Sequence, residues 1–205
     1  MISMLFGLIG GLGLFLFGMN MMASGMQKAA GNKLRRVLEL LTSNPYMATL
    51  TGILVTIVVQ SSSTTSVMVV GFTNSGLMGL SQALGTMLGA SIGTTITAQL
   101  ISFDFSMVVY PLIGVGVGMH LFAKKRIYKS IGQGILGFTI LFIGLEIMSE
   151  AMYPLRSNPF FLKTMSSVSS TPILRVLIGT LFTAIIHSRS ATSVVVIAFT
   201  LQGTI

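Results

Sequence analysis

Long apolar runs separated by short polar segments make up most of the chain. The runs at 5–26, 105–123 and 131–153 are each long enough to cross the hydrocarbon core of a bilayer, which takes about 20 residues as a helix. A further apolar run at 84–102 is interrupted at 89–95 by small and hydroxyl residues. The pattern predicts an all-α polytopic membrane protein, with a break in the helix at 89–95.

The densest polar stretch, Gln60 to Ser66, carries six hydroxyl groups inside a region without charged residues. Such groups cost free energy in lipid unless a partner or ligand uses them. Apolar arms at 45–59 and 64–81 flank the stretch, and the first is too short for a full crossing. We therefore predict a re-entrant helical hairpin, whose tip offers hydroxyls, carbonyls and helix N-terminal amides to ions. The alternative, hydroxyls that merely bond back to the preceding turn, suits isolated Ser and Thr better than a run.

The hairpin pattern occurs twice along the chain. At a constant offset the aligned pairs are Pro45 with Pro172, Gln60 with His187, Ser61 with Ser188, Ser63 with Ser190 and Thr65 with Thr192. The arms of the second hairpin are expected at 173–186 and 191–205. Counting crossings between the basic loops makes the hairpins enter from opposite faces, so the repeat is inverted. We expect a first repeat at 1–123 and a second, inverted and incomplete repeat at 131–205.

Composition and charge support a membrane location. Hydrophobic residues make up 52% of the 205 positions and charged residues only 8%, too few to cover a soluble surface. The net charge of +8 comes mainly from clusters at 28–42 and 124–130, which indicates cytoplasmic loops rather than nucleic-acid binding. An amphipathic helix is expected at 28–41 on the membrane surface. We therefore predict a multi-pass protein of the plasma or inner cell membrane that contacts the lipid bilayer. The absence of cysteine excludes disulfides and thiolate metal sites.

Two motifs carry a resemblance to a known family. Gln60-Ser61-Ser62-Ser63 and the later segment Gly-Ala-Ser-Ile-Gly-Thr-Thr, 89–95, resemble the type II sodium-dependent phosphate cotransporter family. That family has two Gln-Ser-Ser-Ser copies in inverted hairpins, each followed by a Gly-Ala-Asn-Ile-Gly-Thr-Thr-like segment. The second copy here reads His187-Ser188-Arg189-Ser190, and no second glycine-threonine segment precedes Ile205. We expect either a missing C-terminal part or a partner subunit that completes the site. A homo-oligomer is a further open alternative.

The resemblance implies a sodium-coupled phosphate symporter that uses sodium as coupling ion and needs no cofactor. Sodium prefers several oxygen ligands, whereas phosphate needs hydrogen-bond donors, and this set of residues supplies both. The expected substrate- and ion-binding residues are Gln60, Ser61, Ser62, Ser63, Thr64, Thr65, Ser91, Thr94, Thr95, His187, Ser188, Arg189, Ser190 and Thr192. Sodium itself is expected at Ser61, Ser62, Ser63, Thr64, Ser188, Ser190 and Thr192. The alternative is a non-transporting membrane subunit or scaffold derived from such a transporter.

Two residues of the second motif leave alternatives open. Arg189 suits an oxyanion, since its guanidinium binds phosphate in a bidentate way, but it could instead pair with Glu146 or Glu150. His187 is either a proton-linked group or a hydrogen-bonded replacement for glutamine. No acidic residue nearby in the sequence orients His187 as in a hydrolase, and no nucleophile elbow occurs. We therefore predict that the protein is not an enzyme.

Overall fold

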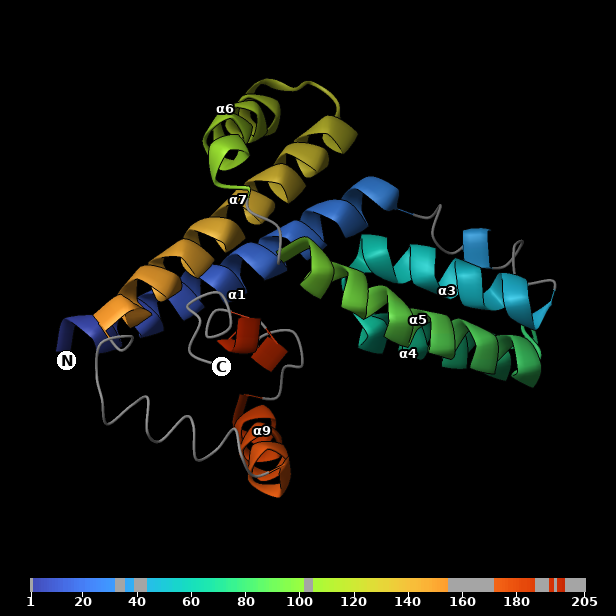
Figure 1. Ribbon diagram of the computed structural model, residues 1–205. Helices are drawn as coiled ribbons and strands as arrows, with labels where there is room; N and C mark the ends of the chain where they lie inside the picture. Colours follow the sequence, from blue (N-terminus) through green and yellow to red (C-terminus); the bar gives the residue numbers. More distant parts are fainter. Residues whose placement is uncertain are drawn as a thin grey trace. The chain divides into compact units, whose positions relative to one another are not determined.

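The described part of the chain is built from helices. The computed structural model describes residues 2–31, 36–38, 44–101, 105–154, 172–186, 192–193 and 195–197. Its helices are α1 (Ile2–Ala30), α3 (Pro45–Val59), α4 (Ser62–Asn74), α5 (Leu80–Ile101), α6 (Ser106–Phe122), α7 (Arg126–Met152) and α9 (Pro172–Ile186) (Figure 1). No strand occurs among these residues. The all-α prediction is therefore confirmed.

The chain forms two compact units, Met1–Gly18 with Thr139–Ile205, and Met19–Phe138. In the first unit, the N-terminal half of α1 packs against the C-terminal half of α7 through glycines. A Cβ placed on Gly11 would lie 2.7 Å from the carbonyl oxygen of Gly144. Helices approach this closely only where side chains are small. The division into repeats at 1–123 and 131–205 is a different partition and stays a prediction.

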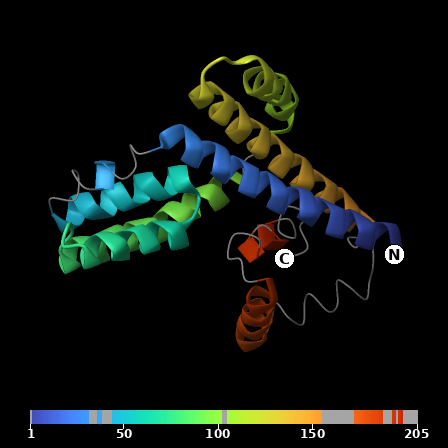
Figure 2. The same ribbon diagram turned by 180° about the vertical axis from the view of Figure 1, so that it is seen from behind.

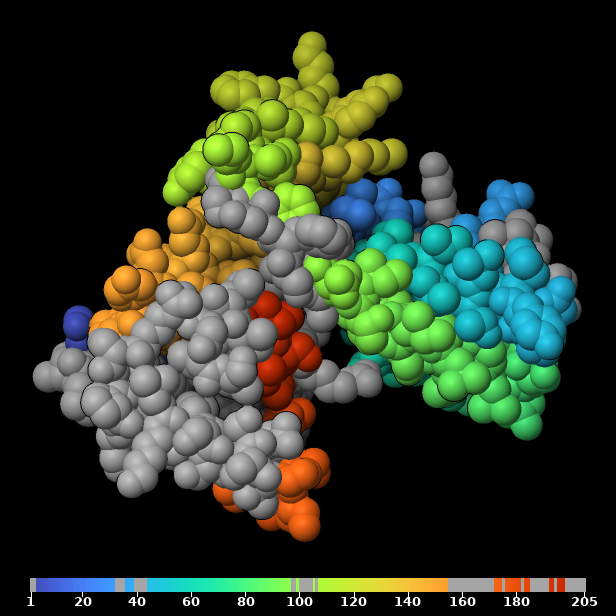
Figure 3. All heavy atoms as spheres, in the orientation of Figure 1, coloured from blue at the N-terminus to red at the C-terminus, as the bar shows by residue number. Residues whose placement is uncertain are grey.

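In the second unit, α3, α4 and α5 pack on one another as a group (Figures 1 and 2). Glycines of α5 meet the backbone of α3 at successive turns: Gly85 at Pro45, Gly89 at Thr49 and Gly93 at Ile53. The numbers rise together along both helices, so α3 and α5 run parallel, and their atoms meet in Figure 3.

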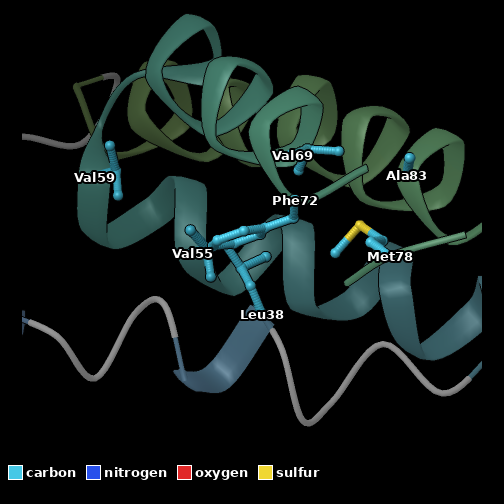
Figure 4. Close-up of a cluster of buried hydrophobic side chains, with 7 residues drawn as sticks. All are labelled: Leu38, Val55, Val59, Val69, Phe72, Met78 and Ala83. Atoms are coloured by element: carbon cyan, nitrogen blue, oxygen red, sulfur yellow. The ribbon is translucent and has the colours of Figure 1, made fainter. Parts of the chain in front are cut away.

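The core of this group is a cluster of buried apolar side chains, Leu38, Val55, Val59, Val69, Phe72, Met78 and Ala83. Phe72 of α4 reaches toward Val55 of α3, with Leu38 beside them (Figure 4). Burial of these side chains stabilises the group by the hydrophobic effect. The group thus holds the turn between α3 and α4 on a packed support.

Only some of the helices are long enough to span a bilayer alone. Within the described residues, Ser3–Ala30 and Arg126–Met152 pass that test by length and hydropathy. Pro45–Val59, Met107–Phe122 and Pro172–Leu181 are shorter apolar helices. The polytopic arrangement and the re-entrant position of the hairpins therefore remain predictions.

Three expectations about local structure need correction. The break expected at 89–95 is absent, because α5 is continuous from Leu80 to Ile101. The return arm of the hairpin ends at Asn74 rather than at 81. Shortly after Asn74 the chain turns through Gly76, which has a φ of +73°. The start of the amphipathic helix expected at 28–41 is also wrong, because residues 28–30 belong to α1 and Gly31 ends that helix with a φ of +51°. Residues 36–38 are helical, and Leu38 is buried in the core of the second unit. The position of this segment on a membrane surface stays a prediction.

Candidate functional site

The hydroxyl-rich stretch lies where one helix ends and the next begins. α3 stops at Val59, as predicted, and α4 starts at Ser62, two residues before the predicted start of the second arm at 64. The break therefore comprises Gln60 and Ser61, the first two residues of the predicted tip. Gln60 adopts the left-handed conformation, with φ 58° and ψ 20°, while its N–H donates to the Thr56 carbonyl at 2.7 Å. It is the single non-glycine residue with positive φ in the described part of the chain. A left-handed conformation costs a residue with a side chain roughly 1–2 kcal/mol, so the surrounding contacts must hold it.

Ser61 starts the second helix as its N-cap. Its backbone is extended, and its Oγ accepts the Thr64 N–H at 3.2 Å. The Thr64 hydroxyl also donates to Ser61 Oγ at 3.0 Å. An N-cap serine satisfies one of the N–H groups that a helix start leaves without a partner. The first serine of the motif therefore has a structural role.

A buried hydroxyl pair joins the two helices across the break. The Oγ1 atoms of Thr56 and Thr65 lie 3.0 Å apart, and both residues are fully buried. Thr65 Oγ1 donates to the Ser61 carbonyl at 3.1 Å, so the proton between the two threonines comes from Thr56. This pair fixes the distance between α3 and α4 next to the turn.

The tip residues differ in how open they are. Ser63 and Thr64 are exposed and Gln60 and Ser61 are half-buried, whereas Ser62 is only 7% exposed. The C-terminal end of α3 carries a partial negative charge and the N-terminal end of α4 a partial positive charge. The break therefore offers carbonyl oxygens suited to a cation beside amides and hydroxyls suited to an anion.

Gln27 contacts the break, and the sequence did not predict this contact. This half-buried residue in the last turn of α1 donates through Nε2 to the Val59 carbonyl at 3.0 Å. The last carbonyls of a helix have no partner within the helix, so the side-chain amide satisfies one of them. The contact joins residues 32 apart in sequence, and no motif signals it.

The α5 segment forms no second break, yet it lies near the first one. Gly93 meets the Thr56 side chain, at a distance of 2.9 Å from a Cβ placed on the glycine. The hydroxyls of Ser91, Thr94 and Thr95 donate to carbonyls of their own helix, at Met87, Ser91 and Ile92 respectively. These bonds satisfy the hydroxyls without breaking the helix.

Most of the second motif lies outside the described residues, including His187, Ser188, Arg189 and Ser190. Of its predicted ligands, Thr192 is described, and it is half-buried in a helical turn. Glu146 and Glu150, the alternative partners of Arg189, are exposed on α7. Within the described residues, no group of three or more His, Cys, Asp or Glu side chains could hold a metal ion. The sodium and phosphate assignments therefore stay predictions.

Known proteins resemble this chain over most of its length. A model of the Na+/Pi-cotransporter family matches residues 14–150. The chain belongs to this family. The family consists of membrane transporters, so the predictions of a phosphate-transport family and of a non-enzyme are confirmed.

Several relatives extend the match. The chain is 31% identical to the uncharacterized protein YqeW of Bacillus subtilis, over 93% of the chain and 62% of YqeW. It is 29% identical to YjbB of Escherichia coli K12, named a putative inorganic phosphate export protein, over 97% of the chain and 36% of YjbB. It is 34% identical to the rat sodium-dependent phosphate transport protein 2A, over 46% of the chain and 15% of that protein. The chain thus spans less than two thirds of each of these relatives. No solved structure gives a significant match.

Proposed function

We propose that the protein carries out sodium-coupled phosphate symport, with the break between α3 and α4 as part of the ion site. The observation that carries the proposal is the left-handed Gln60 followed by a capped, hydroxyl-rich helix start, in a chain of the Na+/Pi-cotransporter family. We further propose that α3 and α4 form a re-entrant hairpin in the plasma or inner membrane. Loops 28–42 and 124–130 would then be cytoplasmic.

Sodium would bind on the α3 side of the break. The C-terminal carbonyls of a helix carry partial negative charge, and the hydroxyl oxygens of Ser61, Ser62, Ser63 and Thr64 lie at the adjoining helix start. Neutral oxygen ligands bind a monovalent cation without placing a fixed negative charge at membrane depth. Ser188, Ser190 and Thr192 would add the contribution of the second repeat.

Phosphate would bind on the α4 side, where donors face outward. The exposed hydroxyl of Ser63 and the amides that precede Thr64 at the start of α4 can donate to oxyanion oxygens. The Thr64 hydroxyl would join them by giving up its bond to Ser61 Oγ. Arg189, His187 and the α5 residues Ser91, Thr94 and Thr95 complete the proposed set. Binding the two ions together lowers the net charge that enters a low-dielectric site, and this is a physical reason for coupling.

The direction of net transport depends on the gradients, because a symporter is reversible. The relative YjbB is named as a putative exporter and the rat relative as a sodium-dependent transporter. The second candidate function is therefore phosphate export through the same site. The non-transporting scaffold is the further alternative, because the second motif has His187 and Arg189 where the first has Gln60 and Ser62.

Uptake into proteoliposomes tests these proposals. The full chain is reconstituted, and entry of radioactive phosphate is measured with an inward sodium gradient and with potassium in its place. We expect uptake that depends on sodium and that falls in Ser63→Ala but not in Ser81→Ala. Ser81 is a matched control, since it is exposed on the first turn of α5, at the end opposite the break. Equal phosphate entry with sodium and with potassium would contradict sodium coupling, and no entry in either would favour the scaffold.

A further inference from the structure

The peptide group between Val59 and Gln60 is held from both sides. Its N–H donates to the Thr56 carbonyl at 2.7 Å, and its carbonyl oxygen accepts from Gln27 Nε2 at 3.0 Å. A peptide group is planar, so two hydrogen bonds on opposite edges fix the orientation of the whole plane. That orientation sets the φ of Gln60, the residue in the left-handed conformation.

Gln27 is itself held firmly on its own helix. Its carbonyl accepts the N–H of Gly31 at 2.9 Å, and Gly31 has a φ of +51°, which gives α1 a left-handed C-terminal cap. Two residues earlier, a Cβ placed on Gly25 would lie 2.4 Å from the backbone nitrogen of Gly134 in α7. The turn of α1 that precedes Gln27 therefore lies directly on α7, and the Gln27 side chain extends from a fixed support.

The assignment of the Gln27 amide is determined by its partner. A carbonyl oxygen only accepts hydrogen bonds, so the group that faces Val59 must be the NH2 end of the side chain. A carboxylate or an aliphatic group at this position could not donate. The Val59 carbonyl would then lose its bond from α1, while the Gln60 N–H would keep its bond to the Thr56 carbonyl.

We propose that Gln27 is a positioning residue for the ion site: its amide keeps the Val59–Gln60 peptide in the orientation that the left-handed turn requires. This role rests on the proposed function only insofar as the turn binds ions. The turn at Gln60 determines where the following hydroxyls point, because Ser61 starts α4 directly after it. Loss of the amide lets the turn sample other orientations and weakens ion binding without removing a ligand.

A thermodynamic cycle tests the positioning role without any transport readout. The melting temperatures of wild type, Gln27→Leu, Gln60→Gly and the double variant are compared by circular dichroism in detergent. Glycine adopts the left-handed conformation without steric cost, so it needs less support from Gln27. We expect Gln27→Leu to lower the melting temperature by about 3 °C in the wild-type background and by clearly less beside Gly at position 60.

A matched control separates this from a general loss of packing. Gln133 is another half-buried glutamine of the same unit, and its side chain contacts Lys28 at 3.4 Å rather than the break. Gln133→Leu should show no coupling to Gln60→Gly. An equal loss from Gln27→Leu in both backgrounds would overturn the proposal, because it would assign Gln27 a merely structural role.

A second variant keeps the test decisive if Gln27→Leu does not fold. In Gln27→Glu the ionised carboxylate cannot donate to the Val59 carbonyl, whereas the protonated acid can. The deficit in melting temperature relative to wild type should therefore shrink as the pH falls toward about 4.5, near the ordinary pKa of glutamate. A deficit that does not change with pH would contradict the hydrogen-bond role.

Ion affinity supplies the functional readout. Loss of one hydrogen bond of ordinary strength corresponds to about a fivefold change in affinity. We expect Gln27→Leu to raise the KM for sodium by about that factor, and Gln133→Leu to leave it unchanged. If the wild type shows no phosphate uptake, the proposed function is wrong, but the melting temperatures still test the positioning role of Gln27. If the protein transports phosphate and the effects of the two substitutions simply add, the positioning role is wrong and the proposed function is unaffected.

Discussion

Gly89→Ala should destabilise the packing of α5 on α3. A Cβ at this position would lie 2.0 Å from the Thr49 carbonyl oxygen and 3.0 Å from the Ile53 nitrogen. Ordinary contact begins near 3.4 Å, so the two helices must separate by more than an ångström. The clashing atoms belong to the backbone and cannot rotate away, which places the cost at the upper end of the roughly 1–3 kcal/mol seen for overpacking. Alanine regains about 1 kcal/mol of helix propensity, leaving a net loss of about 2 kcal/mol.

The matched control is Gly71→Ala. Gly71 lies in α4 of the same unit, and a Cβ there would meet nothing within 4 Å. The chain contains no tryptophan, so thermal unfolding in detergent is followed by far-UV circular dichroism. For a chain of this size, Gly89→Ala should lower the melting temperature by about 4–8 °C, while Gly71→Ala should raise it by about 3 °C. Equal melting temperatures for the two variants would refute the close backbone contact of α3 and α5.

Three other predictions concern the break and its surroundings. Thr65→Val removes the buried hydroxyl that pairs with Thr56 and should cost about 1–2 kcal/mol of stability, whereas Thr73→Val, at a half-buried hydroxyl within α4, should cost less in the same melting assay. Asn44→Ala removes the N-cap of α3 and should cost about 1 kcal/mol, and an unchanged melting temperature would contradict it. Arg189→Ser should lower phosphate affinity and strengthen sodium dependence if the arginine binds the anion, measured by titration calorimetry. Unchanged affinity with lower stability would instead favour an ion pair.

The position of the break could be predicted because its cause is local. A run of hydroxyls between apolar arms competes with the helix for backbone partners, and Ser61 does so as an N-cap. Asn44 and Pro45 likewise indicate the start of α3, because asparagine is a favoured N-cap and proline is favoured at the first helical position. The end of the return arm was harder to predict, because Gly76 turns the chain inside a sequence that remains largely apolar.

The prediction of a break in α5 was wrong because small and hydroxyl residues occur both at helix breaks and on closely packed helix faces. Gly85, Gly89 and Gly93 recur every fourth residue, which places them on one helix face, and that face packs on α3. The hydroxyls of Ser91 and Thr95 bond within the helix. Small and hydroxyl residues therefore indicate either a break or a packing face, and only the tertiary contact decides between them. The hydrogen bond of Gln27 could not be predicted from the sequence either, because its partner is a backbone carbonyl on a different helix.

Under the proposed function, sodium and phosphate bind together at the break between α3 and α4. Titration calorimetry of phosphate into the purified full chain, in sodium and in potassium, tests it most directly. We predict binding in sodium that weakens by at least about tenfold in Ser63→Ala, the loss expected for a hydrogen bond to a charged ligand, and that Ser81→Ala leaves intact. Phosphate affinity that is the same in sodium and potassium, or the same in both variants, would contradict the claim.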